Sequence, residues 1–228
     1  RNLLEKSEPL YKEAYEIVKS SLPPDHPDLA RFLNGRGMLY YSRGQYADAE
    51  KIYQQVLGII EKSVSSDHTY LAKTLNNLAG IYRAMGQYQK AEEYCLKSLK
   101  IKEKMLGSNH HELSYSLNTL AGIYSDTQKW PEAEEIYQRV LNISEGSLPP
   151  GHPDIVLALN NIAYVLSHNG KLDIAEERYN RALEIAEKYP DGNERNREII
   201  LKNFSEFYRL LDKPDKALAL EARLKPSF

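Results

Sequence analysis

Apolar and small residues recur along the chain at intervals of three and four, the spacing of an amphipathic helix, in segments paired around a short turn. In residues 74–99, an apolar stripe from Leu75 to Tyr82 is followed by Gly86, and a second stripe then ends at Leu99. Two stripes of helical period on either side of a glycine predict a helical hairpin. Because the rest of the chain repeats this pattern, we expect hairpins of the same kind throughout.

The hairpin pattern returns at a fixed period. Successive units begin at His26, His68, His110 and His152, which lie 42 positions apart. Three columns recur at constant offsets: Leu33, Leu75, Leu117, Leu159 and Leu201; Gly37, Ala79, Ala121, Ala163 and Ser205; Ala49, Ala91, Ala133, Ala175 and Ala217. Four residues after the last column stand Tyr53, Cys95, Tyr137, Tyr179 and Glu221. The period indicates an array of stacked helix pairs, in which small residues set against large ones let helices approach closely.

The array is expected to be all-α, with about 11 helices in a single domain over residues 1–228. It divides into a partial repeat, four full repeats and a C-terminal repeat: 1–25, 26–67, 68–109, 110–151, 152–193 and 194–228. First helices are predicted near 27–43, 69–85, 111–127 and 153–169, and second helices near 46–62, 88–104, 130–146 and 172–188. The last unit, about 195–224, should have a short second helix. Because the first unit is incomplete, we expect the natural chain to continue upstream.

Composition and charge narrow the function classes. The formal net charge of −2 in 228 residues does not support bulk electrostatic attraction to nucleic acid or to a membrane surface. No run of 18 apolar residues predicts a membrane span, and the first residues do not resemble a signal peptide, so a cytoplasmic protein is expected. A single cysteine excludes an internal disulfide and a multi-cysteine zinc site.

Catalytic and cofactor chemistry has no support in the sequence. We find no glycine-rich phosphate loop, no nucleophile elbow and no Ser-His-Asp constellation, so no enzyme activity and no cofactor are expected. The regularly spaced histidines each begin a unit, and stacked units place them about 10 Å apart, too far for metal coordination at about 2 Å. We interpret them as helix-start residues, and we expect no metal site.

The columns L-x2-L-A-x2-Y…A-x3-Y resemble the tetratricopeptide repeat. The 42-residue period, with His-Pro-Asp at unit starts and LNNLA in a first helix, is similar to the repeats of kinesin light chains; related arrays also accompany nucleotide-binding signalling ATPases. This resemblance implies a right-handed superhelical solenoid whose first helices line a concave groove while the second helices lie outside. Arg36, Gln128 and Glu221 depart from the pattern.

An asparagine row is the first candidate for ligand contact. It contains Asn34, Asn76, Asn118 and Asn160, and a neighbouring column contains Asn77, Asn161 and Asn203. Asparagine is a poor residue in a helix interior, so the row requires another explanation. One hypothesis is that its amides grip the backbone of an extended peptide. The alternative is that one of the two columns is hydrogen-bonded to a neighbouring repeat.

Charged and aromatic columns flank the asparagine row. Toward the amino end these residues are Arg31, Lys73, Tyr41 and Arg83, and toward the carboxyl end they are Tyr115, Leu157 and Tyr164. By analogy with kinesin light chains, the basic end would bind acidic residues of a peptide, while the other end would prefer apolar side chains. The alternative is that the cations are ordinary solvated surface charges.

We therefore expect a noncatalytic scaffold that binds a peptide segment of a protein partner, in the manner of a cargo adaptor. Two alternatives remain open at this stage. The array could be a structural, sensing or autoinhibitory arm of a larger signalling protein, or it could self-associate through its exposed repeat ends. The partner itself is not identified by these patterns.

Overall fold

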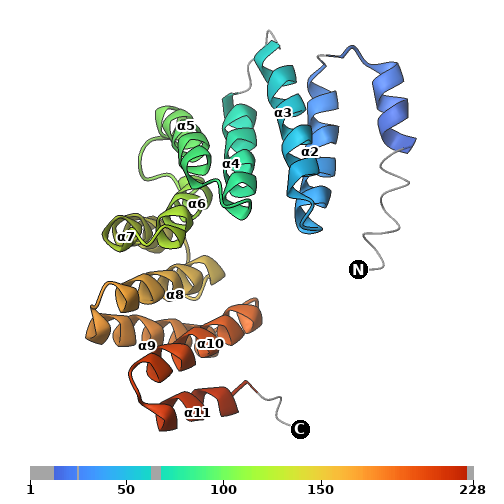
Figure 1. Cartoon of the computed structure of the whole chain (residues 1–228). Coiled ribbons are helices and arrows are strands. Elements are labelled where there is room, and N and C mark those ends of the chain that lie inside the picture. Colours follow the sequence, from blue (N-terminus) through green and yellow to red (C-terminus); the bar gives the residue numbers. More distant parts are fainter. Residues whose placement is uncertain (1–12, 25, 63–67, 225–228) are drawn as a thin grey trace. The chain divides into compact units, whose positions relative to one another are not determined.

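Every regular element of the described residues is a helix, in a computed structural model that describes residues 13–24, 26–62 and 68–224 (Figure 1). The helices are α2 (Pro27–Ser42), α3 (Tyr46–Lys62), α4 (His68–Ala84), α5 (Tyr88–Leu106), α6 (Leu113–Asp126), α7 (Trp130–Ser147), α8 (Pro153–His168), α9 (Leu172–Lys188), α10 (Glu194–Leu210) and α11 (Pro214–Ala222). Residues 13–21 are also helical, while residues 1–12 of the predicted partial repeat lie outside the described residues. The prediction of an all-α array is confirmed.

The predicted helices of the four full repeats each begin and end within two residues of the observed bounds. The largest difference between a predicted and an observed helix start is at α6, which begins at Leu113 instead of residue 111 because a turn occupies residues 111–112. This repeat lacks the proline that starts α2 and α8, where a missing N–H is tolerated in the first turn. The second helix of the last repeat is short, as predicted, with nine residues in α11.

Histidines cap the starts of helices. His26 Nδ1 accepts a hydrogen bond from the Asp28 backbone N–H at 3.2 Å, and His152 Nδ1 accepts one from Asp154 at 3.2 Å. Ahead of α6, His110 Nδ1 accepts from the Glu112 N–H at 3.3 Å. These bonds satisfy backbone donors that have no partner within a helix. The interpretation of these histidines as helix-start residues is confirmed.

The turn inside each helix pair contains one residue in the left-handed backbone region. This residue is glycine in three repeats and a non-glycine in two, as Gly44 (φ 74°), Gly86 (φ 71°), Gln128 (φ 57°), Gly170 (φ 77°) and Asp212 (φ 55°). Glycine adopts this conformation without steric conflict, whereas a side chain is disfavoured there. Gln128 nevertheless adopts this conformation, so the third repeat keeps the hairpin geometry although it lacks the turn glycine.

The helix pairs group into two compact units, which are described separately. Unit 1 ends at Ser108 and contains α2 to α5, and unit 2 begins at Asn109 and contains α6 to α11. The boundary lies next to the predicted junction between two repeats. The expectation of one continuous domain over residues 1–228 stays a prediction.

Small and large residues pack against each other within a pair, as the columns predict. A Cβ atom added to Gly37 of α2 would lie only 2.6 Å from Cε2 of Tyr53, a buried residue of α3. In unit 2 the equivalent residues Ala163 and Tyr179 are both almost fully buried. The alanine column of the second helices, from Ala49 to Ala217, has no exposed surface. Close helix approach therefore depends on these columns.

The cores of the two units differ in chemistry. The core between α2 and α3 is mainly aliphatic, with Leu33, Ile52 and Val56 among its buried members. Around α9 and α10, by contrast, the rings of Tyr179 and Phe204 stack with centroids 4.9 Å apart, and further aromatic rings pack beside them. The same helix-pair framework therefore accommodates both kinds of core.

Tyrosine–glutamate hydrogen bonds join adjacent repeats in each unit. The Tyr82 hydroxyl of α4 donates to Glu50 Oε1 of α3 at 2.7 Å, and the Tyr208 hydroxyl of α10 donates to Glu176 Oε1 of α9 at 2.7 Å. Burial, followed by the bond to Glu50, raises the pKa of Tyr82 to about 12. The Tyr208 hydroxyl lowers the pKa of Glu176 because it stabilises the charged carboxylate. These bonds connect α4 and α10 to the second helix that precedes each of them.

Candidate functional site

The predicted site residues lie on the first helices of the pairs. They are distributed as Arg31, Asn34 and Tyr41 on α2; Lys73, Asn76, Asn77 and Arg83 on α4; Tyr115 and Asn118 on α6; Leu157, Asn160, Asn161 and Tyr164 on α8. The framework columns of these helices face the core, so a ligand can meet only the other columns. The exposure of each predicted residue therefore decides whether it is available for contact.

Two of the four asparagines in the row are sealed within the helix packing, so their predicted role in peptide contact is wrong. Asn76 is 1% exposed and Asn160 is 2% exposed. Cys95 Sγ lies 3.8 Å from Asn76 Oδ1, and Asn160 Oδ1 accepts a hydrogen bond from Asn203 at 3.1 Å. Amides at this depth satisfy internal polar groups, and a ligand on the surface cannot reach them.

Two residues of the neighbouring asparagine column, Asn77 and Asn203, are hydrogen-bonded to the preceding repeat, which was the alternative interpretation. In unit 1, Asn77 Nδ2 donates to Asn34 Oδ1 at 3.2 Å and to the Tyr53 hydroxyl at 3.2 Å. In unit 2, Asn203 makes the equivalent bond to Asn160. These amides therefore join adjacent repeats in both units.

The remaining asparagines are half-buried. Asn118 Nδ2 donates to the Ser114 carbonyl at 2.8 Å, and Asn161 Oδ1 accepts from Asn160 Nδ2 at 3.2 Å. Asn118 Oδ1 is buried without a hydrogen-bond partner among the described residues. Peptide contact stays a prediction for Asn34, Asn77, Asn118 and Asn161.

The predicted cations of unit 1 lie at the surface. Lys73 is exposed on α4, and Arg31 is exposed on α2, where its guanidinium lies 3.2 Å from Asp28 Oδ1. An exposed pair of this kind contributes little stability and leaves the arginine accessible to an anion. Arg83 is half-buried, and Tyr41 is 43% exposed. The first helices of unit 1 therefore present basic and aromatic groups to solvent.

The predicted residues of unit 2 are apolar and aromatic. Tyr115 of α6 is 62% exposed, Tyr164 of α8 is 38% exposed and Leu157 is half-buried. Large exposed apolar side chains on one helix face are typical of surfaces that bind other molecules. No basic residue of the predicted set lies on these two helices.

An aromatic cluster around Trp130 was missed by the sequence analysis. The Trp130 ring, at the start of α7, lies 4.6 Å from the His168 ring and 6.4 Å from the Tyr164 ring, measured between centroids. The Tyr164 and His168 centroids are 4.4 Å apart. The available signal was a column of aromatic residues that start second helices, Tyr46, Tyr88 and Trp130. Attention to first helices alone left this column out.

Two carboxylates act on the aromatic cluster. Burial raises the pKa of the Tyr164 hydroxyl, and the negative charges of Glu206 on α10 and Asp126 on α6 raise it further. An anion nearby disfavours the tyrosinate and holds the hydroxyl in its neutral form. The surface around Tyr164 is therefore both aromatic and acidic.

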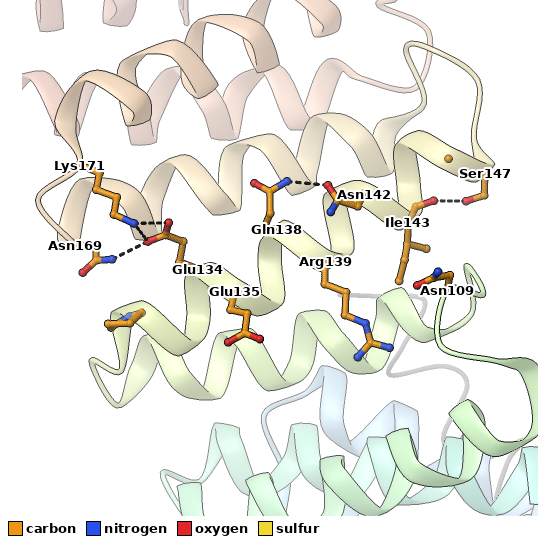
Figure 2. A pocket seen from close by; sticks show the side chains of 12 residues that line it. Asn109, Glu134, Glu135, Gln138, Arg139, Asn142, Ile143, Ser147, Asn169 and Lys171 are labelled. Atoms are coloured by element: carbon orange, nitrogen blue, oxygen red, sulfur yellow. Dashed lines mark hydrogen bonds and ion pairs between the residues drawn. The ribbon is translucent and has the colours of Figure 1, made fainter.

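A separate polar recess lies on α7, one of the second helices expected to lie outside the groove. Its volume is about 850 Å³, and its lining includes Asn109, Glu134, Gln138, Arg139, Asn142 and Lys171. Figure 2 shows Lys171 and Asn169 both reaching Glu134. Each of these bonds is 2.7 Å long, so the carboxylate is already neutralised by a cation.

The recess has an origin in the sequence. Glu134 occupies the same column as Glu50 and Glu176, which accept tyrosine hydroxyls, but Leu166 replaces the corresponding tyrosine in α8. Without that hydroxyl, Glu134 takes Asn169 and Lys171 as partners. The signal in the sequence was Leu166, in a column that otherwise contains Tyr40, Tyr82, Tyr124 and Tyr208, and the consequence at Glu134 required the structure.

Reactive groups are few in the described part of the chain. Cys95 is fully buried, so it serves as a packing residue rather than as a reactive thiol. The donor atoms of His110, His111 and Glu112 lie within 4.8 Å of one another, the one such grouping among the described residues. One His110 nitrogen already accepts a backbone bond there. None of the described helices is both long and apolar enough to cross a membrane.

Comparisons with known proteins agree with this architecture. The family profile of the tetratricopeptide repeat matches residues 2–62, 70–146 and 154–224. A crystal structure of BtubC (BKLC) from P. vanneervenii has a TM-score of 0.81 and 21% identity, covering 97% of this chain and 89% of that one. A putative kinesin light chain from Podosopora anserina with nearly identical repeats has a TM-score of 0.75 and 25% identity, covering 87% and 94%.

A third structure extends the comparison beyond kinesin light chains. A Rap protein in complex with Competence and Sporulation Factor has a TM-score of 0.73 and 19% identity, covering 97% of this chain and 60% of that one. No curated protein matches the chain in sequence. At these identities, BtubC and the Rap protein establish similarity of fold alone.

Proposed function

We propose that this chain, which belongs to the tetratricopeptide repeat family, is a noncatalytic scaffold that binds a segment of a partner protein on the surface of its first helices. Repeats of this family form protein-interaction scaffolds, and the helix pairs described above have that architecture. The Rap structure in complex with Competence and Sporulation Factor supports partner binding by this kind of array. The identity of the partner has to come from the surface chemistry.

The observation that carries the proposal is the composition of the exposed columns on the first helices. Lys73 and Arg31 are exposed in unit 1, and Tyr115 and Tyr164 are exposed in unit 2. All four positions lie outside the framework columns that pack the helices. Exposed aromatic and basic residues contribute strongly to protein interfaces because they offer large contact area and directional hydrogen bonds. Helix packing alone does not require them.

Unit 1 is suited to an acidic segment. The ammonium of Lys73 and the guanidinium of Arg31 can both form charge-assisted hydrogen bonds with carboxylates. Tyr41, at the end of α2, adds an exposed ring that can cover an apolar side chain. The proposed affinity therefore comes from basic and aromatic side chains. The buried Asn76 and Asn160 serve instead to satisfy polar groups inside the helix packing.

The test is to select peptides from a random library displayed on phage, and then to measure their affinities for variants by fluorescence anisotropy. Lys73→Glu should weaken acidic peptides at least about tenfold, because a favourable ionic contact becomes a repulsive one. Lys100→Glu is the matched control, since Lys100 is exposed on the second helix α5 and its reversal changes the net charge equally. Circular dichroism should show the same helicity for both variants.

The proposal fails if no peptide is selected, or if both lysine reversals weaken binding to the same extent. The first result would mean that the first-helix surface does not hold a peptide. The second would mean that overall charge, rather than the surface around Lys73, governs binding. Retention of affinity by both variants would also contradict the assignment of acidic peptides to unit 1.

A further inference from the structure

We propose that the aromatic cluster of unit 2, defined by Trp130, Tyr164 and His168 with Glu206 beside it, binds an arginine side chain of the partner segment. The inference deepens the proposed function, since it assumes that a polypeptide lies along the first helices. It assigns to unit 2 a ligand group opposite in charge to the one that unit 1 would take. No residue of this cluster except Tyr164 belonged to the predicted site.

The cluster is a built arrangement of rings. Tyr164 and His168 lie one turn apart on α8, and Trp130 approaches both of them from the start of α7. His168 Nδ1 lies 2.9 Å from the Tyr164 carbonyl oxygen. The Ser167 hydroxyl lies 3.1 Å from the same nitrogen, and these two contacts hold the imidazole against its neighbours. The rings therefore keep a defined orientation at the surface.

The cluster remains accessible to solvent. Tyr164 is 38% exposed, His168 is exposed and Trp130 is half-buried. A ring that is half in solvent offers part of its face to a ligand, and the face of an aromatic ring is its electron-rich region. A cation placed over such a face is attracted by the ring quadrupole, most strongly over tryptophan.

Two carboxylates contribute negative charge near Tyr164. Glu206 is exposed on α10 and Asp126 is exposed on α6, and the charges of both act on the Tyr164 hydroxyl. Within the described part of the chain, Glu206 forms neither a hydrogen bond nor an ion pair. It can therefore accept a ligand cation without losing a partner in the protein. An acidic ligand would instead be repelled here.

Arginine fits this surface better than lysine. Its guanidinium is planar, so it can stack on a ring while its N–H groups donate to a carboxylate, and it is more weakly hydrated than an ammonium. A lysine ammonium would gain the Coulomb attraction but would not stack in the same way. The pairing of rings with a carboxylate therefore points to arginine.

The experiment uses hexa-arginine, hexa-lysine and hexa-citrulline peptides at constant ionic strength. Trp130 is the single tryptophan of the chain, so its fluorescence reports on ligand at this surface. Hexa-arginine should produce a saturable fluorescence change. Hexa-citrulline, which has the same shape without the charge, should bind at least about tenfold more weakly. Hexa-lysine should bind a few times more weakly than hexa-arginine.

Variants locate the site. Glu206→Gln should weaken the binding of hexa-arginine at least about fivefold. Glu184→Gln should not weaken it, because this substitution removes the same charge from an exposed position on the second helix α9. Tyr164→Leu should weaken hexa-arginine several-fold while binding of hexa-lysine changes less. Thermal unfolding should verify that each variant remains folded.

Three results would overturn the inference: equal affinity for hexa-arginine and hexa-lysine, equal affinity for hexa-citrulline, or equal loss in Glu206→Gln and Glu184→Gln. Failure here is distinguishable from failure of the proposed function. Lys73→Glu should leave hexa-arginine binding unweakened, and Glu206→Gln should leave acidic library peptides bound. If library peptides bind while hexa-arginine does not, only the arginine site is wrong. If hexa-arginine alone binds as described, the peptide proposal for unit 1 is wrong instead.

Discussion

Unit 1 and unit 2 are built from the same repeat, but the surfaces of their first helices differ in charge. In unit 1, Lys73 and Arg31 are exposed, whereas in unit 2 the exposed groups around Tyr164 are aromatic rings and the carboxylate of Glu206. The framework columns of the two units are equally buried, with Leu75 and Leu159 as examples. Columns that set helix packing and columns that set surface chemistry are therefore separate, so one fold can carry two different binding surfaces.

The interiors of the two units differ as well. In unit 1, Gly37 lies opposite Tyr53, whereas the equivalent residue is Ala79 in the other helix pair of unit 1 and Ala163 in unit 2. In the turns inside the helix pairs, unit 1 has glycine at both left-handed positions, but unit 2 has Gln128 and Asp212 at two of its three. Equivalent positions therefore have unequal tolerance for substitution, and this difference can be measured.

Gly37→Ala should have the largest effect, because its new Cβ would lie 2.6 Å from the buried ring of Tyr53. Overpacking of this kind lowers the free energy of unfolding by about 1–3 kcal/mol. The measurement is urea unfolding followed by circular dichroism. Gly80→Ala is the control, since nothing lies within 4 Å of the added Cβ, and it should stabilise α4 by up to about 1 kcal/mol. Equal stability of the two variants would contradict the close packing at Gly37.

Asn203→Ala should lower the free energy of unfolding by about 1–2 kcal/mol, because it leaves the buried oxygen of Asn160 without its donor. Asn77→Ala removes the equivalent bond in unit 1 and should be less damaging. Of its two acceptors, Asn34 is half-buried and can be satisfied by water, and the Tyr53 hydroxyl keeps its own bond to the Asn34 carbonyl. Thermal unfolding would measure both. A larger loss for Asn77→Ala would show that burial does not decide the strength of these links.

Tyr82→Phe should lower the free energy of unfolding by about 1 kcal/mol at pH 8, through loss of the bond to Glu50. The Tyr82 phenol has a pKa of about 12 when folded and about 10 when unfolded. Its contribution is therefore fully present below pH 10 and is lost as pH rises from 10 to 12. Urea unfolding across this range should show a flatter decline for the variant. Parallel curves for variant and parent would exclude this linkage.

Gln128→Gly should have the smallest effect and the opposite sign. A side chain is disfavoured in the left-handed backbone conformation of Gln128, and its replacement by glycine removes this steric conflict. The turn should gain up to about 1 kcal/mol, so the variant should unfold at a slightly higher temperature. The converse variant in unit 1, Gly86→Gln, should lose a similar amount because Gly86 has the same conformation. Identical unfolding temperatures for parent and both variants would mean that turn strain does not limit stability in either unit.

The helix positions were predictable because the repeat averages out local ambiguity. A single apolar run leaves the bounds of a helix uncertain, but five aligned copies locate the turn column, and the residues from Gly44 to Asp212 all share one backbone conformation. The departure at Gln128 could therefore be assigned from the period. The role of Glu221 was less predictable, since it occupies an aromatic column and instead forms an ion pair with Arg209 at 2.8 Å.

The candidate site was predictable only in part, because exposure depends on neighbouring helices. Lys73 and Tyr115 lie at the surface, as a contact role requires. Asn76 of α4 and Asn160 of α8 have the same polar appearance in the sequence, yet both are buried. An amide is compatible with both surroundings, so its position in a helix period does not show whether its partner is a ligand or another repeat.

The sequence by itself determined the helix pairs, their period and the columns that hold them together, because those features depend on local spacing repeated along the chain. Only the tertiary structure decided which polar columns reach solvent, and it alone brought Trp130 of one pair against Tyr164 of the next. The physical reason is that burial and ring contact arise between residues far apart in the chain. The distance between two such residues depends on the volumes of the side chains packed between their helices and on the geometry of the turns that join the helices.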